Sequence, residues 1–256
     1  MKTTLCLLMT LSLLGGVLAA DAPAPVGPRI NILVISKTAG YRHQVIPTGI
    51  KALEEIAQHQ KWGITATEDT SLVTPEFLAH FDVIAFLMTT KTIFSSEQKA
   101  AIEGFVKGGK GLITIHTGAD TEYDWPWYNQ QLGVKFIGHP PAQKARLVIE
   151  DRTHPATSFF PAAEWVTTDE WYSFNRDPRA DVHVLISIDE STYSVDDNRW
   201  FAGVKQRMGD HPLVWYTQSE KGRVFQTALG HTEEMWADPL YRQHLTGAIE
   251  WTAGTK

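Results

Sequence analysis

Three short runs of apolar, mostly β-branched residues constrain the fold of this chain more than any other feature. Ile30 to Ile35, Asp82 to Met88 and Gly111 to Ile115 show no regular alternation of polar and apolar side chains. Strands buried on both faces, as in a parallel sheet covered by helices, have this pattern. Residues 46 to 57 between the first two runs carry apolar side chains at helical spacing. The first half therefore predicts alternating strands and helices, as in a doubly wound α/β sheet.

Local signals predict where further elements begin. Thr74 before Pro75 is typical of a helix start, and Ser95 with Gln98 three residues later has the spacing of a capping box. A closing helix is predicted from Asp238. The second half is richer in strands, which we expect to extend or flank the main sheet. These strands are predicted at residues 145–150, 182–188, 213–216 and 223–229.

The first residues have the layout of a secretory signal peptide. Lys2 precedes an apolar run from Leu5 to Leu18, and small residues follow. This run is short for a membrane span, although an uncleaved anchor is the alternative. We expect a signal peptide at residues 1–20, a flexible tether at 21–29 and one domain at 30–254. The protein is then expected to be secreted or periplasmic, with no stable membrane insertion.

Charge and cysteine content argue against several classes of function. The net charge is −6, acidic and basic residues are interspersed, and no long Lys/Arg cluster occurs, so nucleic acid is not an expected partner. Cys6 is the only cysteine and lies in the leader, so the mature chain would have no thiol nucleophile and no disulfide. No nucleotide cofactor is expected, and the sequence leaves the oligomeric state open.

Histidines follow several of the predicted strands. His116 comes directly after residues 111–115, His231 follows the strand at 223–229, and His43 lies in the loop that leaves the first strand. In open α/β sheets, ligands bind beyond the carboxyl ends of the strands. We therefore expect these three rings to meet at one edge of the sheet.

A fourth histidine and the chemistry of imidazole suggest a metal. His139, between a glycine and a proline, lies at a tight turn that either aims the ring into the site or exposes it. Neutral imidazoles with carboxylates suit a divalent ion, zinc first, but no compact ligand motif is present. The predicted metal ligands are His43, His116, His139 and His231.

The remaining histidines are expected to be structural. Two lie near the ends of predicted helices, where a cation offsets the helix dipole. These are His59 and His80. The others have no position at the end of a predicted strand, and they are His154, His183, His211 and His244.

Carboxylates and aromatic residues accompany the candidate histidines. Asp120 lies in a dense polar loop after His116, Glu170 stands in a second acidic and aromatic segment, and Glu233 follows His231 by two residues. A carboxylate beside an imidazole forms the base half of a nucleophile-activating triad, but no nucleophile is present. The predicted catalytic residues are His116, Asp120, Glu170, His231 and Glu233.

Flat aromatic side chains near these carboxylates could stack on sugar rings, with packing within the loops as the alternative. The candidate substrate-binding residues are Tyr41, Arg42, Thr89, Glu122, Asp124, Trp125 and Trp171.

The chain resembles the ThuA-like (trehalose utilisation) family of the class I glutamine-amidotransferase-like superfamily. The matching segments are KTAGYRH, TATED, GKGLITIHTGADTEYDWPWY, GHP, EDRTHPAT, TDEWYSF, DESTY, MGDHP and ALGHTEE. The resemblance implies a three-layer flavodoxin-like α/β fold with a mainly parallel central sheet. It also places His116 where amidotransferases carry their cysteine, with His231 and Glu233 at their histidine and glutamate. An imidazole cannot form the thioester, so glutamine amidotransferase activity is not expected.

Members of this family are associated with the use of trehalose and related disaccharides, often beside oxidoreductases that make 3-keto glycosides. A ketone at C3 acidifies the hydrogen at C2, so a histidine or carboxylate base could remove it, with help from a metal. The resulting hypothesis is an enzyme that eliminates, isomerises or hydrolyses a keto sugar or glycoside. The alternatives are a non-catalytic sugar-binding module and a plain metal-assisted hydrolase.

Overall fold

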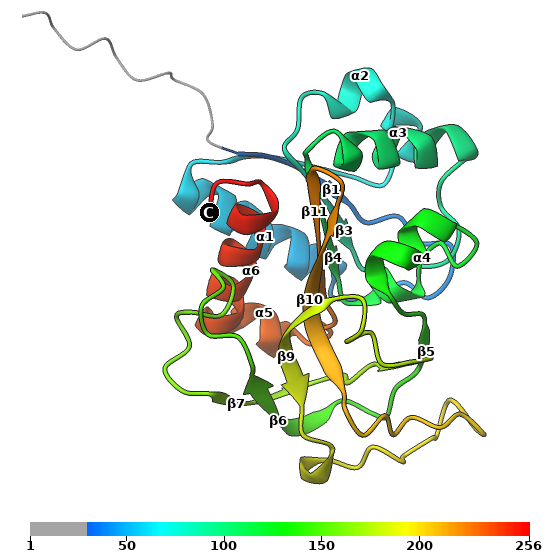
Figure 1. Cartoon of the computed structure of the whole chain (residues 1–256), viewed down its shortest axis with the longest axis vertical. Helices are drawn as coiled ribbons and strands as arrows, with labels where there is room; N and C mark the ends of the chain where they lie inside the picture. Colours follow the sequence, from blue (N-terminus) through cyan, green and yellow to red (C-terminus); the bar gives the residue numbers. More distant parts are fainter. Residues whose placement is uncertain (1–29) are drawn as a thin grey trace, which may run out of the picture.

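A continuous sheet joins parallel strands, most of them from the first half of the chain, to antiparallel strands from the second half. The computed structural model describes residues 30–256, so the predicted signal peptide and the predicted tether lie outside the described residues. The sheet has nine strands in the order β2-β1-β3-β4-β11-β10-β9-β6-β7. The predicted three-layer α/β fold with a mainly parallel core is confirmed (Figure 1).

The two halves of the sheet differ in strand direction. The parallel strands are β2 (Gly63–Thr67), β1 (Asn31–Ile35), β3 (Val83–Leu87), β4 (Gly111–Ile115) and β11 (Gly222–Thr227). The antiparallel strands are β10 (Pro212–Ser219), β9 (His183–Ile188), β6 (Gln143–Ile149) and β7 (Glu164–Asp169). A separate two-stranded sheet pairs β5 (Phe136–Gly138) with β8 (Ser173–Phe174).

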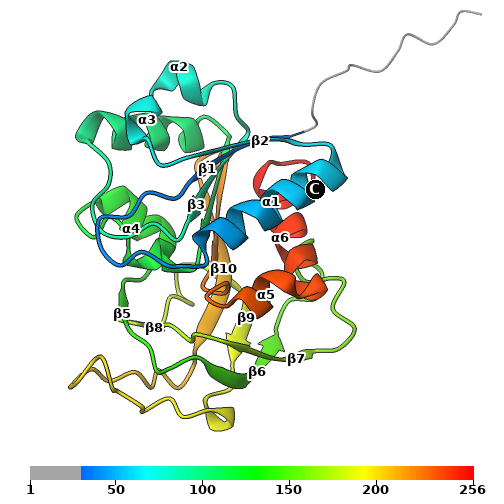
Figure 2. The ribbon, with the colours of Figure 1, turned by 180° about the vertical axis from the view of Figure 1, so that it is seen from behind.

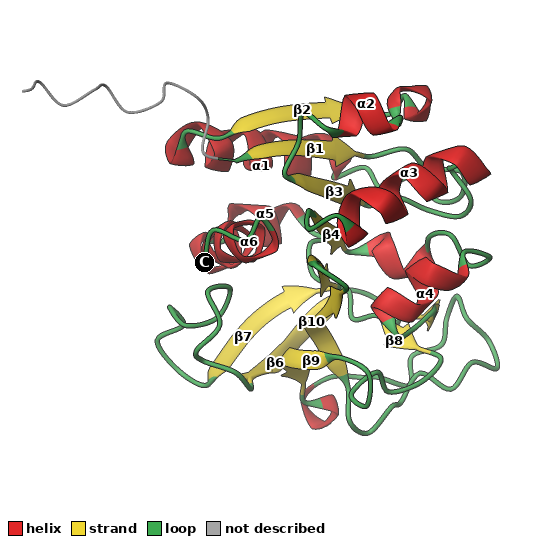
Figure 3. Cartoon of the chain, turned by 45° about the horizontal axis from the view of Figure 1, so that its top comes forward, coloured by secondary structure: helices red, strands yellow, loops and turns green. Residues whose placement is uncertain are grey.

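Helices cover both faces of the parallel half, as Figures 2 and 3 show. One face carries α1 (Ile46–Gln60), α5 (Glu233–Ala237) and α6 (Pro239–Thr252), and the other carries α2 (Pro75–Leu78), α3 (Ser96–Lys107) and α4 (Pro126–Leu132). The structure also contains the short 3-10 helices η1 (Thr70–Leu72), η2 (Thr117–Asp120) and η3 (Glu190–Thr192). Two hydrophobic clusters result: the smaller one lies between the parallel strands and α2, α3 and α4, and the larger one extends from α1, α5 and α6 into the antiparallel strands. Within residues 30–256, no helix has the length and apolar character needed to span a membrane.

The predicted helix starts are present. Ser95 and Gln98 form the complete capping box before α3, and Thr74 accepts a hydrogen bond from the N–H of Phe77 at the start of α2. Asp238 accepts from the N–H of Leu240 in the same way at α6.

Helix α4 was missed in the sequence because its short aromatic segment has no clear helical period. It is stabilised by contacts from outside the helix: Tyr128 is fully buried, and its ring stacks on that of Trp125 with 5.5 Å between centroids. Its hydroxyl also donates to the carbonyl oxygen of Gly118. Trp125, one of the aromatic residues predicted to stack on sugars, is therefore packed into a core.

Candidate functional site

His116 occupies a strained turn directly after β4. Its φ is 60° and its ψ is −103°, which is uncommon for a residue with a side chain. The backbone N–H donates to the carbonyl oxygen of Thr227, at 2.8 Å. Ring nitrogen Nδ1 lies 3.0 Å from the carbonyl oxygen of Ala228. Because that oxygen can only accept, the ring proton stays on Nδ1, and Nε2 keeps its lone pair and lies 3.2 Å from Nδ1 of His231.

The three strand-end histidines meet, as the sequence predicted. The ring centroids of His43 and His116 are 4.8 Å apart, those of His43 and His231 are 5.1 Å apart, and those of His116 and His231 are 5.2 Å apart. These residues follow β1, β4 and β11, so the common edge of the parallel strands brings them together.

Glu170, just after β7, completes this group from the antiparallel half of the sheet. Its Oε2 lies 3.2 Å from Nδ1 of His231 and 3.5 Å from Nε2 of His116. One potential ligand atom each from His43, His116, Glu170 and His231 lies within 4.8 Å of the others, so this cluster could hold a metal ion.

Two buried atoms in the cluster lack hydrogen bonds. Oε2 of Glu170 lies within ion-pair distance of the rings of His116 and His231, but it forms a hydrogen bond with neither. Nδ1 of His43 has no hydrogen-bond partner among residues 30–256. Buried polar atoms are nearly always paired, so these two require an explanation. A divalent ion bound between them would satisfy both, and three imidazoles with one carboxylate match the donors that zinc prefers.

The electrostatics give His43 and Glu170 the protonation states that a metal needs, whereas His231 holds its proton more tightly than a free histidine. Burial, with added repulsion from His116 and His231, lowers the pKa of His43 to about 2, so this ring is neutral. Burial raises the pKa of Glu170, but the close approach and the charge of His116 and His231 outweigh burial and lower the pKa, so the carboxylate is ionised. Burial lowers the pKa of His231, whereas Glu170 more than reverses this and raises it.

Asp169 positions the loop that carries His231. Its Oδ2 accepts from the N–H of Gly230 at 2.7 Å, and its Oδ1 accepts from the N–H groups of His231 at 2.9 Å and Thr232 at 3.2 Å. Burial raises the pKa of Asp169. Successive side chains of an extended chain point to opposite sides, so Asp169 binds the loop while Glu170 faces the histidines.

His139 contacts the cluster through Glu170. Its Nδ1 lies 3.0 Å from Oε1 of Glu170 and 3.0 Å from the carbonyl oxygen of Pro140. Both neighbours are acceptors, so the proton is held on Nδ1 and Nε2 keeps its lone pair. Burial lowers the pKa of His139, partly offset by Glu170. His139 was expected among the metal ligands, but Glu170 instead completes the group of four.

A cavity of about 580 Å³ adjoins the cluster, within the size range of small-molecule sites. Its lining residues come from loops at the carboxyl ends of several strands and from the second half of the chain. They are Tyr41, His43, Lys91, Thr117, Asp120, Phe136, His139, Glu170, Tyr172, Trp200, Phe201 and His231. Tyr41 is 65% exposed, and its ring stands edge-on to that of His43 at 4.7 Å.

Lys91 and Asp120 form a charged pair in the cavity wall. Nζ of Lys91 is 2.7 Å from Oδ1 of Asp120, which also accepts from the hydroxyl of Tyr123. The backbone of Lys91 has a φ of 59°, another strained position near the site. Asp120 was among the predicted catalytic residues, whereas Lys91 was missed although it follows β3 closely.

Several predicted substrate-binding residues lie in the protein interior, outside the cavity lining. The carboxylate of Glu122 accepts from the N–H groups of Ile93 and Phe94 and pairs with Lys99, so it stabilises the segment before α3. Thr89 bonds the hydroxyl of Thr121.

The two tryptophans proposed to stack on sugars are also buried. Trp125 packs in the core beside α4, and Trp171 is fully buried with its Nε1 donating to the carbonyl oxygen of Gln143, at 2.8 Å. Their burial leaves no free ring face for a ligand. Sequence alone could not distinguish these rings from Trp200, which is 58% exposed at the cavity.

The other predicted residues are at the surface. Arg42 forms an exposed ion pair with Glu68, and Asp124 is exposed and absent from the cavity lining. Glu233 is the first residue of α5 and borders a smaller hollow on the other side of His43 and His231. The carboxylate beside His231 is that of Glu170, so Glu233 does not orient this ring.

Comparisons with known proteins agree with this fold. The ThuA family model, described as trehalose utilisation, matches residues 31–252. A ThuA-like protein from Bacteroides uniformis is 24% identical, with a TM-score of 0.72 over 91% of this chain and 95% of that one. A ThuA-like protein from Parabacteroides merdae is 18% identical, with a TM-score of 0.68 over 89% and 91% of the two chains. No curated protein matches the chain.

A β-galactosidase from Bacillus circulans shares the fold over part of its length. It is 11% identical, with a TM-score of 0.56 over 89% of this chain and 31% of that one.

Proposed function

This chain belongs to the ThuA family, described as trehalose utilisation, and we propose that it is an enzyme that acts on a 3-keto disaccharide or glycoside. The observation that carries the proposal is the group of four converging ligand residues beside a cavity large enough for a sugar. A satisfied structural cluster would have neither the unpaired buried atoms nor the adjoining space. The apparent leader sequence supports a secreted or periplasmic location.

The metal ligands in this proposal are His43, His116, Glu170 and His231. A divalent ion held there supplies a Lewis acid for the ketone oxygen of the substrate. Glu170 also aligns His139, because Oε1 faces the ring nitrogen that carries the proton. One carboxylate thus serves both the ion and the neighbouring imidazole.

His139 is the proposed base. Its Nε2 lone pair removes the proton at C2, which the C3 ketone has made acidic, and the electrons of that C–H bond form the C1–C2 double bond as the C1–O bond breaks. The leaving oxygen then takes a proton, and we assign its delivery to Lys91, which contacts Asp120 in the same cavity. The net reaction is an elimination that splits the disaccharide without added water.

Mass analysis of 3-keto trehalose incubated with zinc-loaded protein tests this proposal. Elimination gives two products whose masses sum to that of the substrate, whereas hydrolysis adds one water and isomerisation leaves the mass unchanged. His139→Gln should retain stoichiometric zinc and lose about a hundredfold or more of the rate. Full recovery of unchanged substrate, with sugar binding retained, would instead support a non-catalytic sugar-binding module.

A further inference from the structure

A long segment between η3 and β10 reaches the cavity at its tip. We call residues 193–211 the recognition loop. Its Trp200 and Phe201 line the cavity, and their rings lie 5.5 Å and 4.9 Å from that of His139. Trp200 is 58% exposed, and the exposed ring of Tyr41 lines the same cavity, so exposed aromatic surface is concentrated at this site.

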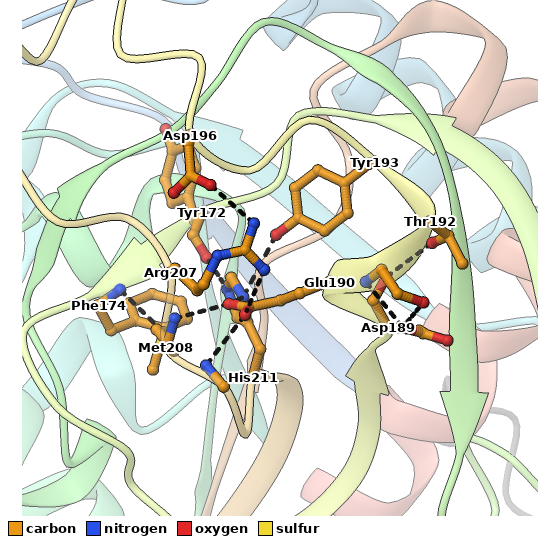
Figure 4. Close-up of polar contacts among 12 residues, drawn as sticks. Tyr172, Phe174, Asp189, Glu190, Thr192, Tyr193, Asp196, Arg207, Met208 and His211 are labelled. Atoms are coloured by element: carbon orange, nitrogen blue, oxygen red, sulfur yellow. Dashed lines mark hydrogen bonds and ion pairs between the residues drawn. The ribbon is translucent and has the colours of Figure 1, made fainter.

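Glu190 binds the far end of this loop (Figure 4). Its Oε1 accepts from the N–H of Met208 at 2.6 Å, and its Oε2 accepts from the N–H of Gly209 at 3.1 Å. Nδ1 of His211 lies 3.0 Å from Oε1, and Arg207 also contacts the carboxylate. Glu190 lies in η3, which directly precedes the recognition loop in the sequence. Its side chain therefore joins the two ends of the loop.

The same cluster reaches the cavity wall. Nε2 of His211 lies 2.8 Å from the carbonyl oxygen of Tyr172, whose side chain lines the cavity two residues after Glu170. Arg207 makes a second tie across the loop, 2.7 Å from Oδ2 of Asp196. These contacts fix the position of the base of the recognition loop relative to Tyr172 in the cavity wall.

We propose that the recognition loop selects disaccharides, with Trp200 and Phe201 contacting the sugar ring that does not react and Glu190 acting as the positioning residue. This inference rests on the proposed function. When one sugar ring of the disaccharide binds beside His43, His116, Glu170 and His231, the second sugar ring lies toward the exposed indole of Trp200. The indole offers a flat apolar face suited to the C–H face of a sugar.

Binding can be measured without turnover in the His139→Gln background. With zinc present, Trp200→Ala should weaken 3-keto trehalose binding about tenfold, because an aromatic contact of this kind contributes roughly one factor of ten, and should weaken methyl 3-keto-glucoside binding less than twofold. Leu72→Ala, another exposed apolar residue, is the control and should change neither.

Calorimetry separates this proposal from the function it rests on. A selective loss of disaccharide affinity in the Trp200→Ala variant, together with no turnover of 3-keto trehalose by the protein that retains His139, would support the loop and reject the reaction. Equal losses for both sugars, no loss for either, or no sugar binding by the parent protein would overturn the loop proposal.

Trypsin tests the role of Glu190, since Arg199 and Lys205 lie in the loop. Glu190→Gln should speed cleavage at these sites severalfold and weaken 3-keto trehalose binding as Trp200→Ala does, while zinc affinity stays within twofold of the parent. Exposed Glu164→Gln is the matched control. Arg207→Met, which removes the tie to Asp196, gives a milder form of the same test if Glu190→Gln does not fold. Unchanged cleavage in both variants would contradict the positioning role.

Discussion

Two buried glutamates in this protein pair with histidines, and they differ in how completely their atoms are bonded. Glu190 receives two backbone N–H groups, Arg207 and His211, and the other nitrogen of His211 faces a carbonyl oxygen. Glu170 meets three imidazoles, yet its Oε2 lacks a hydrogen bond and a cavity lies beside it. Similar residue types thus build a structural clamp in one place and the proposed ligand site in the other, and hydrogen-bond completeness distinguishes them.

The largest expected effect comes from removing the carboxylate at the incomplete cluster. Glu170→Gln should weaken zinc binding about a thousandfold, since even a residue that only supports a metal ligand contributes 10- to 100-fold. Competition with a chelating dye measures this affinity. Glu233→Gln is the matched control and should bind zinc as the parent does. Equal affinities for the parent and Glu170→Gln would show that the cluster is not a metal site.

A pair of stability measurements sharpens the same contrast. His211→Leu should lower the free energy of unfolding by about 3 kcal/mol, because the charged Glu190 and a carbonyl oxygen lose their partner. His43→Leu removes a buried nitrogen that has no partner, so metal-free protein should stay within about 1 kcal/mol of the parent. Urea unfolding of both variants without metal provides the comparison. A larger loss of unfolding free energy for His43→Leu than for His211→Leu would show that His43 is a structural residue.

His244 offers a third arrangement, a buried imidazole with neither a carboxylate nor a cavity. Burial lowers its pKa to about 4, although the carbonyl oxygen of Ala156 opposes this. The unfolded chain, with a histidine pKa near 6.5, therefore binds more protons between pH 6.5 and 4. Stability should fall through that window as the pH falls, by about 2 kcal/mol at pH 5 relative to pH 7, and change no further below pH 4.

Urea unfolding at several pH values checks this expectation. His244→Gln should be less stable at neutral pH and should lose this part of the acid sensitivity. An identical pH dependence in the parent and variant would remove His244 as its source.

The smallest expected effect concerns an aromatic residue that the sequence suggested for sugar binding. Trp171→Phe loses the hydrogen bond from Nε1 to the carbonyl oxygen of Gln143 and should cost about 1 kcal/mol of stability. Titration with 3-keto trehalose should show unchanged affinity, because Trp171 is fully buried outside the cavity. A selective loss of affinity would mean that this wall of the site opens to ligands.

The sequence predicts the parallel half of the fold well, because buried strands and helix caps are local patterns. It also predicts the meeting of His43, His116 and His231, since all three follow parallel strands. It does not distinguish Glu170 from Glu122, because both are acidic residues in polar loops and only tertiary contacts direct one to the cavity and the other to backbone N–H groups. Trp200 was missed for the same reason, as exposure is set by the path of a loop.

The wide separation of His43 and His231 along the chain has a consequence for how the protein unfolds. An ion coordinated by both residues would act as a cross-link between segments near the two ends of the described chain. Since such an ion binds only the assembled fold, a free concentration one hundred times its dissociation constant would add about 2.7 kcal/mol to the free energy of unfolding. Chelation would then lower the melting temperature of the whole sheet, so heat resistance would follow the metal supply.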